Sequence, residues 1–227
     1  MFRRAAALGL FLHFACAATS AQAGVVTYNF DDGTLGGLIK TNDPGYSASV
    51  ANGVVTVSNP AGTPAFGRVT LTTPFTVSGD FTASVLADRT GIGQSQIGIQ
   101  AGADSTALAD IFFQRTNVIA ANAFKPSVTT LFQDTNSSPV VTLTIARQGN
   151  TLTETYNDGV VNVSHSHTDP ILAAPVTLAL FLVTDLGDTG AHQGTLDNFT
   201  ITSASVPEPT CAGLLVLATT LVIRRRR

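Results

Sequence analysis

The stretch that decides the fold is VVTLTIARQGNTLTETYNDGVVNVSHS, at residues 140–166. Apolar and polar residues alternate from Val141 to Ile145, which is the pattern of a β-strand with one face packed on a core. The alternation is interrupted at Gly149-Asn150 and at Asp158-Gly159, where tight turns require residues that accept a positive φ. The stretch therefore predicts two successive β-hairpins.

The whole region between residues 24 and 205 has the same character. Segments rich in β-branched and aromatic residues are separated by Gly, Asn, Asp and Pro, and no long segment has the 3.6-residue period of an amphipathic helix. At most one helical turn is expected, at residues 105–110. The region is long enough for one sandwich domain. Its expected strands are 25–30, 46–50, 54–58, 68–72, 81–87, 97–101, 111–115, 118–124, 140–147, 151–156, 160–166, 176–183 and 196–202.

Three short motifs resemble those of a known superfamily. They are Gly79-Asp80-Phe81-Thr82, the strand-turn-strand at residues 143–152, and Leu196-Asp197-Asn198-Phe199-Thr200-Ile201. Together they resemble the concanavalin A-like lectin/glucanase superfamily, including its laminin-G-like members. The resemblance implies an all-β fold, a two-sheet antiparallel jelly-roll sandwich with residues 25–30 and 196–201 side by side. A galactose-binding-like jelly roll is the alternative.

The first residues of the chain have the organisation of a signal peptide. Arg3 and Arg4 precede an apolar segment at residues 5–18, and Ala21-Gln22-Ala23 is a small-x-small cleavage site. We expect signal peptidase to remove residues 1–23, so that the mature chain begins at Gly24. The protein is therefore expected to be exported.

The last residues, 206–227, have three parts. Val206-Pro207-Glu208-Pro209-Thr210 is followed by an apolar segment at residues 211–223 and then by Arg224-Arg225-Arg226-Arg227. This order resembles the PEP-CTERM sorting signal of bacteria that make exopolysaccharide, which implies the membrane protease exosortase as a partner. As a helix of ~1.5 Å per residue, the apolar segment reaches ~20 Å, short of a ~30 Å hydrocarbon core. We expect a short hydrophobic helix that inserts transiently, with the arginines as a cytoplasmic stop.

The charge of the region between these ends limits its partners. Residues 24–205 contain six basic and fourteen acidic residues, a formal net charge of −8. A domain this acidic, without a basic cluster, excludes nucleic acid and anionic membrane surfaces as expected partners. Both cysteines, Cys16 and Cys211, lie in the end segments, so no disulfide is expected in the domain.

The sequence predicts no catalytic residues. The glucanases of the superfamily resemble one another in a strand with Glu-x-Asp-x-Glu, which supplies the two carboxyl groups of glycoside cleavage. Glu154 is the one glutamate between residues 24 and 205, and its flanks at that spacing are Leu152 and Tyr156. This alternation allows Glu154 to face inward with a perturbed pKa, but without a partner that the sequence identifies. Nearly all other carboxylates stand in turn-like sequence and are expected to be solvated.

The remaining acidic pairs and serines do not change this expectation. Asp31 and Asp32 are adjacent, so in a strand they would point to opposite faces, and Asp185 and Asp188 are expected in a loop. No Gly-x-Ser-x-Gly nucleophile elbow is present. We therefore expect that the protein is not an enzyme.

Two sets of residues are candidate metal ligands. Asp31, Asp32 and Asp197, with Asn198, would meet if the first and last strands pair, and such oxygen ligands suit a structural calcium ion. A solvated, acid-rich strand end is the alternative. His165 and His167 share one face of a strand and would bind a transition metal if His192 supplied a third ligand. For these two histidines a polar outward face or a hairpin edge is the favoured interpretation. No other cofactor is expected.

The expected function follows from these observations. The chain has no Trp and only three Tyr, so no exposed aromatic platform for sugar rings is evident. We expect an exported protein with a structural or adhesive role in the cell envelope, on the outer surface or in the extracellular matrix of a bacterium, where extracellular polysaccharide is a candidate partner. A soluble carbohydrate-binding, lectin-like module is the first alternative. A hydrolase with an unrecognised site is the second.

Overall fold

The computed structural model describes residues 24–62, 67–93, 95–102, 108–114, 117–124, 129–184 and 190–204. The expected signal peptide, the sorting signal and the loop residues Asp185 and Asp188 lie outside these residues. No helix in the described ranges has the length and apolar character needed to cross a membrane.

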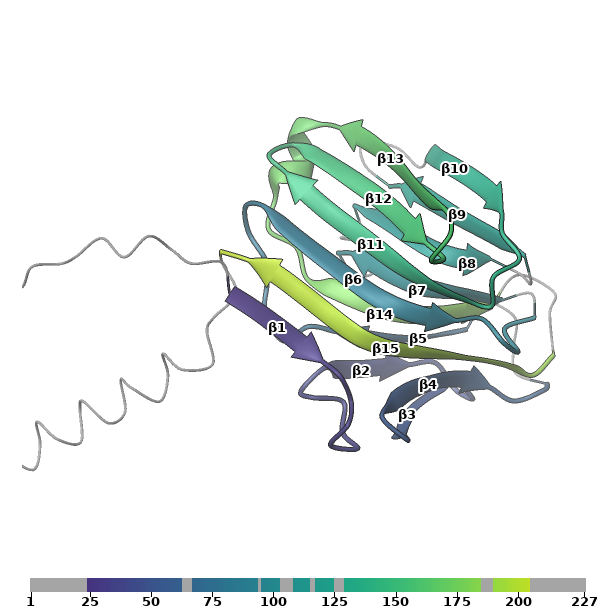
Figure 1. The fold of residues 1–227 in the computed structure, drawn as a ribbon. Coiled ribbons are helices and arrows are strands. Elements are labelled where there is room, and N and C mark those ends of the chain that lie inside the picture. The colour runs from purple at the N-terminus through teal and green to yellow at the C-terminus, as the bar shows by residue number, and fades with distance from the viewer. Residues whose placement is uncertain are drawn as a thin grey trace, which may run out of the picture.

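Two antiparallel β-sheets pack face to face as an all-β, jelly-roll sandwich (Figure 1). The first sheet, sheet A, has eight strands, and the second, sheet B, has seven. One strand of sheet A, β1 (Gly24–Tyr28), pairs with β15 (His192–Ser203). The spatial order of the other strands of sheet A is β13 (Asn162–Thr168), β12 (Thr151–Asn157), β11 (Val140–Gln148), β6 (Phe81–Asp88), β15 (His192–Ser203), β4 (Val54–Asn59) and β3 (Ser47–Ala51). The order of sheet B is β10 (Thr129–Thr135), β9 (Val118–Ala123), β8 (Ala109–Gln114), β7 (Ser95–Ala101), β14 (Leu178–Thr184), β5 (Arg68–Thr72) and β2 (Ile39–Asn42).

Both expected hairpins are confirmed. β11 pairs with β12 and β12 with β13, and Gln148 stands opposite Thr151, so the first turn has two residues. Gly149 and Gly159 take φ values of 58° and 88°. A positive φ at the first turn residue alone is the arrangement that favours glycine in a two-residue hairpin loop.

Every expected strand is present, with ends displaced by a few residues, and two further strands were not predicted. β2 is exposed along its whole length, so its sequence has no apolar alternation. β10 contains a register shift between Thr130 and Phe132, and this bulge breaks the alternation. Within residues 105–110, where at most one helical turn was expected, Ala109 and Asp110 belong to β8. A 3-10 turn is found instead at Pro170–Ala173, capped by Asp169.

The first and last strands pair as the resemblance implied. Val26 stands opposite Ile201 and Tyr28 opposite Phe199, and the rings of Tyr28 and Phe199 stack with centroids 5.6 Å apart. Gly24, the expected first residue of the mature chain, is buried opposite Ser203. The two ends of the domain therefore leave the sandwich side by side.

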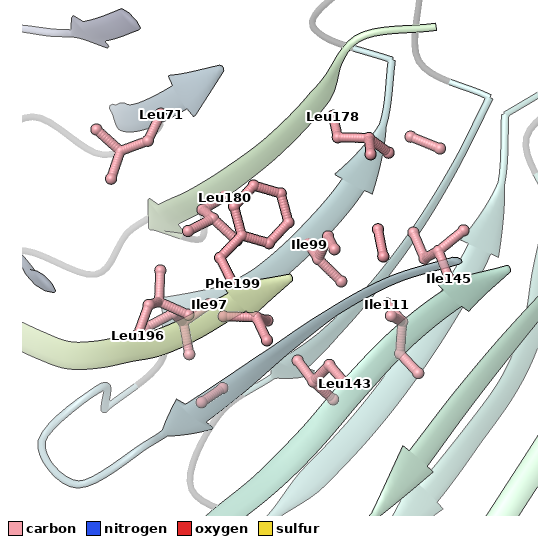
Figure 2. Close-up of a cluster of buried hydrophobic side chains, with 14 of the residues drawn as sticks. Leu71, Ile97, Ile99, Ile111, Leu143, Ile145, Leu178, Leu180, Leu196 and Phe199 are labelled. Atoms are coloured by element: carbon pink, nitrogen blue, oxygen red, sulfur yellow. The ribbon is translucent and has the colours of Figure 1, made fainter. Parts of the chain in front are cut away.

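The core lies between the sheets. Aliphatic side chains from both sheets meet there, and each fully buried one contributes about 1.5–3 kcal/mol relative to exposure. Figure 2 shows a fully buried group from this core: Leu71, Ile97, Ile99, Ile111, Leu178 and Leu180 of sheet B, with Leu143, Ile145, Leu196 and Phe199 of sheet A.

The first two motifs of the superfamily resemblance meet around Arg147. Its guanidinium is buried and lies over the Phe81 ring, 4.8 Å from the centroid. The Arg147 Nε donates to the Gly79 carbonyl at 2.7 Å, and Nη1 donates to the Leu172 carbonyl at 2.9 Å and to a neighbouring carbonyl of the 3-10 turn. Burial lowers the pKa of Arg147. The motif residues thus join β6, β11 and the 3-10 turn.

Candidate functional site

The candidate calcium ligands Asp31 and Asp32 follow the end of β1 and Asp197 lies on β15, and each makes local hydrogen bonds. Asp31 accepts from the Asn29 side chain at 2.6 Å, and Asp197 accepts from the Asn198 backbone at 2.6 Å. Asp32 accepts from the backbone and hydroxyl of Thr34, which lowers the pKa of Asp32. In the described part of the chain, no group of three His, Cys, Asp or Glu side chains is placed to hold a metal ion. Calcium at these residues remains a prediction.

The histidines of β13 face the inside of the sandwich, so the outward-face interpretation is wrong. The His165 ring stacks on Phe132 of β10 with centroids 4.3 Å apart. β13 and β10 lie against each other across the sandwich (Figure 1). His192 lies on β15, and β12, β11 and β6 stand between β15 and β13. Four strand spacings of ~4.8 Å separate them, so His192 is too distant to be a third metal ligand.

Glu154 faces inward, as the alternation of β12 allowed. Its side chain is 0% exposed, and its Oε2 lies 3.6 Å from Nδ1 of His167. Neither the carboxyl oxygens of Glu154 nor the ring nitrogens of His167 make a hydrogen bond with the described residues. Burial raises the pKa of Glu154, and His167 partly opposes that shift. The structure thus supplies a partner for Glu154 that the sequence did not identify.

The outer face of sheet B contains a row of polar side chains that sequence reasoning missed. Gln100, Asp110, Asn122 and Thr130 are cross-strand neighbours on β7, β8, β9 and β10. The Asn122 amide donates to Asp110 Oδ1 at 3.2 Å, and the Thr130 hydroxyl donates to Asn122 Oδ1 at 3.1 Å. Asp110 is 5% exposed, and its burial raises the pKa of its carboxyl to about 8. The sequence did contain a signal for a buried carboxyl group here. The residues beside Asp110 are the apolar Ala109 and Ile111, whereas most other acidic residues stand in turn-like sequence.

Next to this row lies an aromatic pair on the same face. Phe112 and Phe181 pack edge to face with centroids 6.1 Å apart and form a second hydrophobic cluster with Ala120. Between them stands Gly98, where an added Cβ would come within 2.2 Å of the Ile111 carbonyl oxygen. These rings point away from the core and are nevertheless buried, at 2% and 5% exposure. The outer face of sheet B is therefore shielded from solvent at these rings. We call the outward residues Gln100, Asp110, Phe112, Asn122 and Phe181 the sheet B recess.

The outer face of sheet A is different, because it is open and rich in hydroxyl groups. Cross-strand pairing places one hydroxyl residue on each of six neighbouring strands. We call this set the hydroxyl row: Thr27 (β1), Thr200 (β15), Ser84 (β6), Thr144 (β11), Thr155 (β12) and Ser164 (β13). Beside it, an open groove of about 570 Å³ is lined by Thr202, Thr82 and Thr153, among others.

No protein-family model matches the sequence, and a search of curated proteins finds no match. Solved structures do match. The CBM2 module of the evolved Dit of Lactobacillus casei BL23 phage J-1 is similar, with 13% identity and a TM-score of 0.60, over 82% of this chain and 99% of that module. Lectin I-B4 from Griffonia simplicifolia, in its metal-free form, is 13% identical with a TM-score of 0.56, over 78% and 98% of the two chains. Family 7 alginate lyase A1-II′ is 12% identical with a TM-score of 0.54, over 72% and 85%.

At these identities the likeness is one of fold. The expected two-sheet jelly-roll sandwich is confirmed, and lectins and lectin-like proteins are similar to it in fold over most of their own length.

Proposed function

We propose that the chain is an exported glycan-binding protein of the bacterial cell envelope or extracellular matrix, with the sheet B recess as its binding site. The observation that carries this proposal is the polar row of Gln100, Asp110 and Asn122 beside Phe112 and Phe181. The amides of Gln100 and Asn122 are partly exposed and can fix the hydroxyls of a sugar, whereas Asp110 and the two rings beside them are buried. Ligand sites usually contain a few such convergent polar groups.

The state of Asp110 favours this role. Burial raises the pKa of the Asp110 carboxyl to about 8, which favours its protonated form, and a protonated carboxyl can donate a hydrogen bond as well as accept one. The adjoining amides of Gln100 and Asn122 each offer both kinds of group. A neutral glycan fits better than an anionic one, because the domain has a net charge of −8.

The likeness to a CBM2 module and to lectins supports the glycan-binding part of the proposal. The two ends of the sequence support export and an adhesive role. Residues 1–23 would be removed by signal peptidase, and residues 206–227 would insert transiently in the membrane and present Val206–Thr210 to exosortase. The partners are then these two proteases during delivery and extracellular polysaccharide afterwards.

Hydrolysis is not part of the proposal. Asp110 and Glu154 are the described carboxyl groups whose pKa is raised. They lie on opposite sides of sheet B, because Asp110 points outward from that sheet and Glu154 points into the sandwich. Two carboxyl groups that cleave a glycosidic bond must flank it at about 5–10 Å. No sugar can lie between these two.

A glycan array tests the proposal. Residues 24–204 contain every described strand and the core, and this region should bind one or more neutral glycans. Gln100→Ala and Asn122→Ala should weaken that binding at least tenfold, since each removes a hydrogen-bonding amide from the recess. Thr41→Ala, an exposed change on β2, is the control. An array without any bound glycan, or binding that both recess variants retain in full, would contradict the proposal.

A further inference from the structure

The hydroxyl row crosses sheet A without a gap. Thr27 stands opposite Thr200, Thr200 opposite Ser84, and Ser84 opposite Thr144. Thr144 stands in turn opposite Thr155, and Thr155 opposite Ser164. All six side chains are partly or fully exposed. Six strands at ~4.8 Å make a continuous row about 24 Å long.

Hydrogen bonds between the hydroxyls hold the row in place at both of its ends. Thr155 and Ser164 are 2.8 Å apart, and Thr27 and Thr200 are 3.3 Å apart. In each pair one hydroxyl donates to the other, which leaves one hydrogen and several lone pairs for an outside partner. Threonine is also stiff at χ1. A partner therefore meets donors and acceptors that are already ordered, at a small entropic cost.

Part of the face around the row lacks charge. On β11, β12 and β13 the outward residues are hydroxyl, amide or small apolar, and the outward side chains there include no Asp, Glu, Lys or Arg. Exposed edge strands are usually protected by charged residues. The outward charges near the row are the carboxylates Asp88 on β6 and Asp197 on β15.

A groove lies directly beside the hydroxyl row. Thr202, Thr82, Ala146 and Thr153 are cross-strand neighbours on β15, β6, β11 and β12, and they line the groove of about 570 Å³. Typical ligand pockets have ~300–1,000 Å³. The groove and the row therefore run in the same direction, across the strands.

These features identify the kind of partner. The strand spacing of ~4.8 Å is close to the length that one sugar adds to an extended β-linked glycan. A hydroxyl-rich surface on an acidic domain suits an uncharged, hydroxyl-rich polymer. A flat crystalline surface fits less well, because neighbouring strands twist by about 20–25° and lose register in two dimensions. A second copy of the chain fits less well too, since the face offers little apolar area for a stable dimer.

We propose that the hydroxyl row and its groove bind a neutral, linear polysaccharide, with the chain lying across β15, β6, β11 and β12. This inference rests on the proposed glycan-binding function and adds a second surface on the side of the sandwich opposite the sheet B recess. One domain then contacts two glycan chains and links them.

Electrophoresis in native gels tests the inference. Hydroxyethyl cellulose is the neutral probe, and carboxymethyl cellulose is an anionic probe with the same backbone. The row variant combines Ser84→Ala, Thr144→Val and Thr155→Val. The matched control combines Ser49→Ala, Thr56→Val and Thr195→Val, which are the same types of change on β3, β4 and β15 of the same face.

The wild-type protein and the matched control should be retarded by hydroxyethyl cellulose and not by carboxymethyl cellulose. The row variant should lose at least threefold in affinity with an unchanged Tm. Gln100→Ala, which changes only the sheet B recess, should still be retarded by hydroxyethyl cellulose. Loss of binding at the recess and loss of binding at the hydroxyl row are therefore distinguishable. Either the row variant or Gln100→Ala should weaken cross-linking of glycan chains. The inference is overturned if the neutral polymer does not retard the wild type, or if the row variant binds it as well as the control does. It is also overturned if the row variant differs from the wild type only in self-association, measured by ultracentrifugation.

Discussion

Replacement of Glu154 by methionine should stabilise the protein at neutral pH. The carboxyl is fully buried, its oxygens have no hydrogen-bond partner among the described residues, and His167 is 3.6 Å away. Methionine has a similar length and adapts to the space between Leu152 and Tyr156. Removing a buried carboxyl group that has no hydrogen-bond partner removes its desolvation penalty, which is about 1–3 kcal/mol.

The sign of the pH dependence follows from the raised pKa of Glu154. The folded state holds the proton of Glu154 more tightly than the unfolded chain does. The resulting stability is fully present below the ordinary pKa of 4.5 and is lost as pH rises through the raised value. The advantage of Glu154→Met over wild type should therefore be small at pH 4 and should grow toward pH 7.5. Asp110, also with a raised pKa, is present in both proteins and largely cancels in the difference.

Urea unfolding at pH 4, 6 and 7.5 measures this difference, and each kcal/mol also corresponds to about 2–4 °C in Tm for a domain of this size. Leu152→Met, on the same strand and the same face, is the control and should change stability by less than about 1.5 kcal/mol at every pH. A loss of more than about 1 kcal/mol in Glu154→Met at pH 7.5 would refute the reasoning, because it would mean that the carboxylate is well paired in the folded state. A difference that does not change with pH would refute the linkage argument.

Four further predictions concern other parts of the chain. Arg147→Met should destabilise the domain by about 3–5 kcal/mol in urea unfolding, because it leaves several buried carbonyls without a donor; a loss below about 1 kcal/mol would contradict this role. Alanine at Pro207-Glu208-Pro209 should leave the domain folded but change its envelope fraction or processing, and an unaltered distribution in a host with active exosortase would disprove a sorting role. Calcium should raise Tm if Asp31, Asp32 and Asp197 bind it, whereas equal Tm values with calcium and with chelator would remove that site. The purified domain should release no reducing sugar from β-glucans or from the host's own exopolysaccharide, and release abolished by Glu154→Gln would establish a hydrolase.

Much of the fold was predictable from local sequence. The alternation from Val141 to Ile145 and the glycines at 149 and 159 predicted the two hairpins, because side-chain periodicity and a positive φ are local properties. The inward position of Glu154 followed from the same alternation. The strands β2 and β10 were missed, since an exposed strand and a bulged strand have no regular alternation.

The candidate site depended on tertiary structure. Alternation along β8 shows that Asp110 and Ile111 face opposite sides, but it does not show which side is the core or that the outer side is also enclosed. The sequence had placed Arg147 at the end of an expected strand, and it had left open whether His192 comes near His165 and His167. In the folded domain Arg147 is buried and donates hydrogen bonds to carbonyls of other segments. The sheet order places His192 four strand spacings away from His165.

The sequence by itself determined that the domain is all-β and where most of its strands lie. It also determined that charged residues are few and mostly acidic. Only the tertiary structure decided which residues meet across strands, because register and sheet order depend on contacts between segments far apart in the chain. Thr27, Ser84 and Thr155 are hydroxyl residues in three separate segments of the chain. They form one row only because β1, β15, β6, β11 and β12 pair in that order and register.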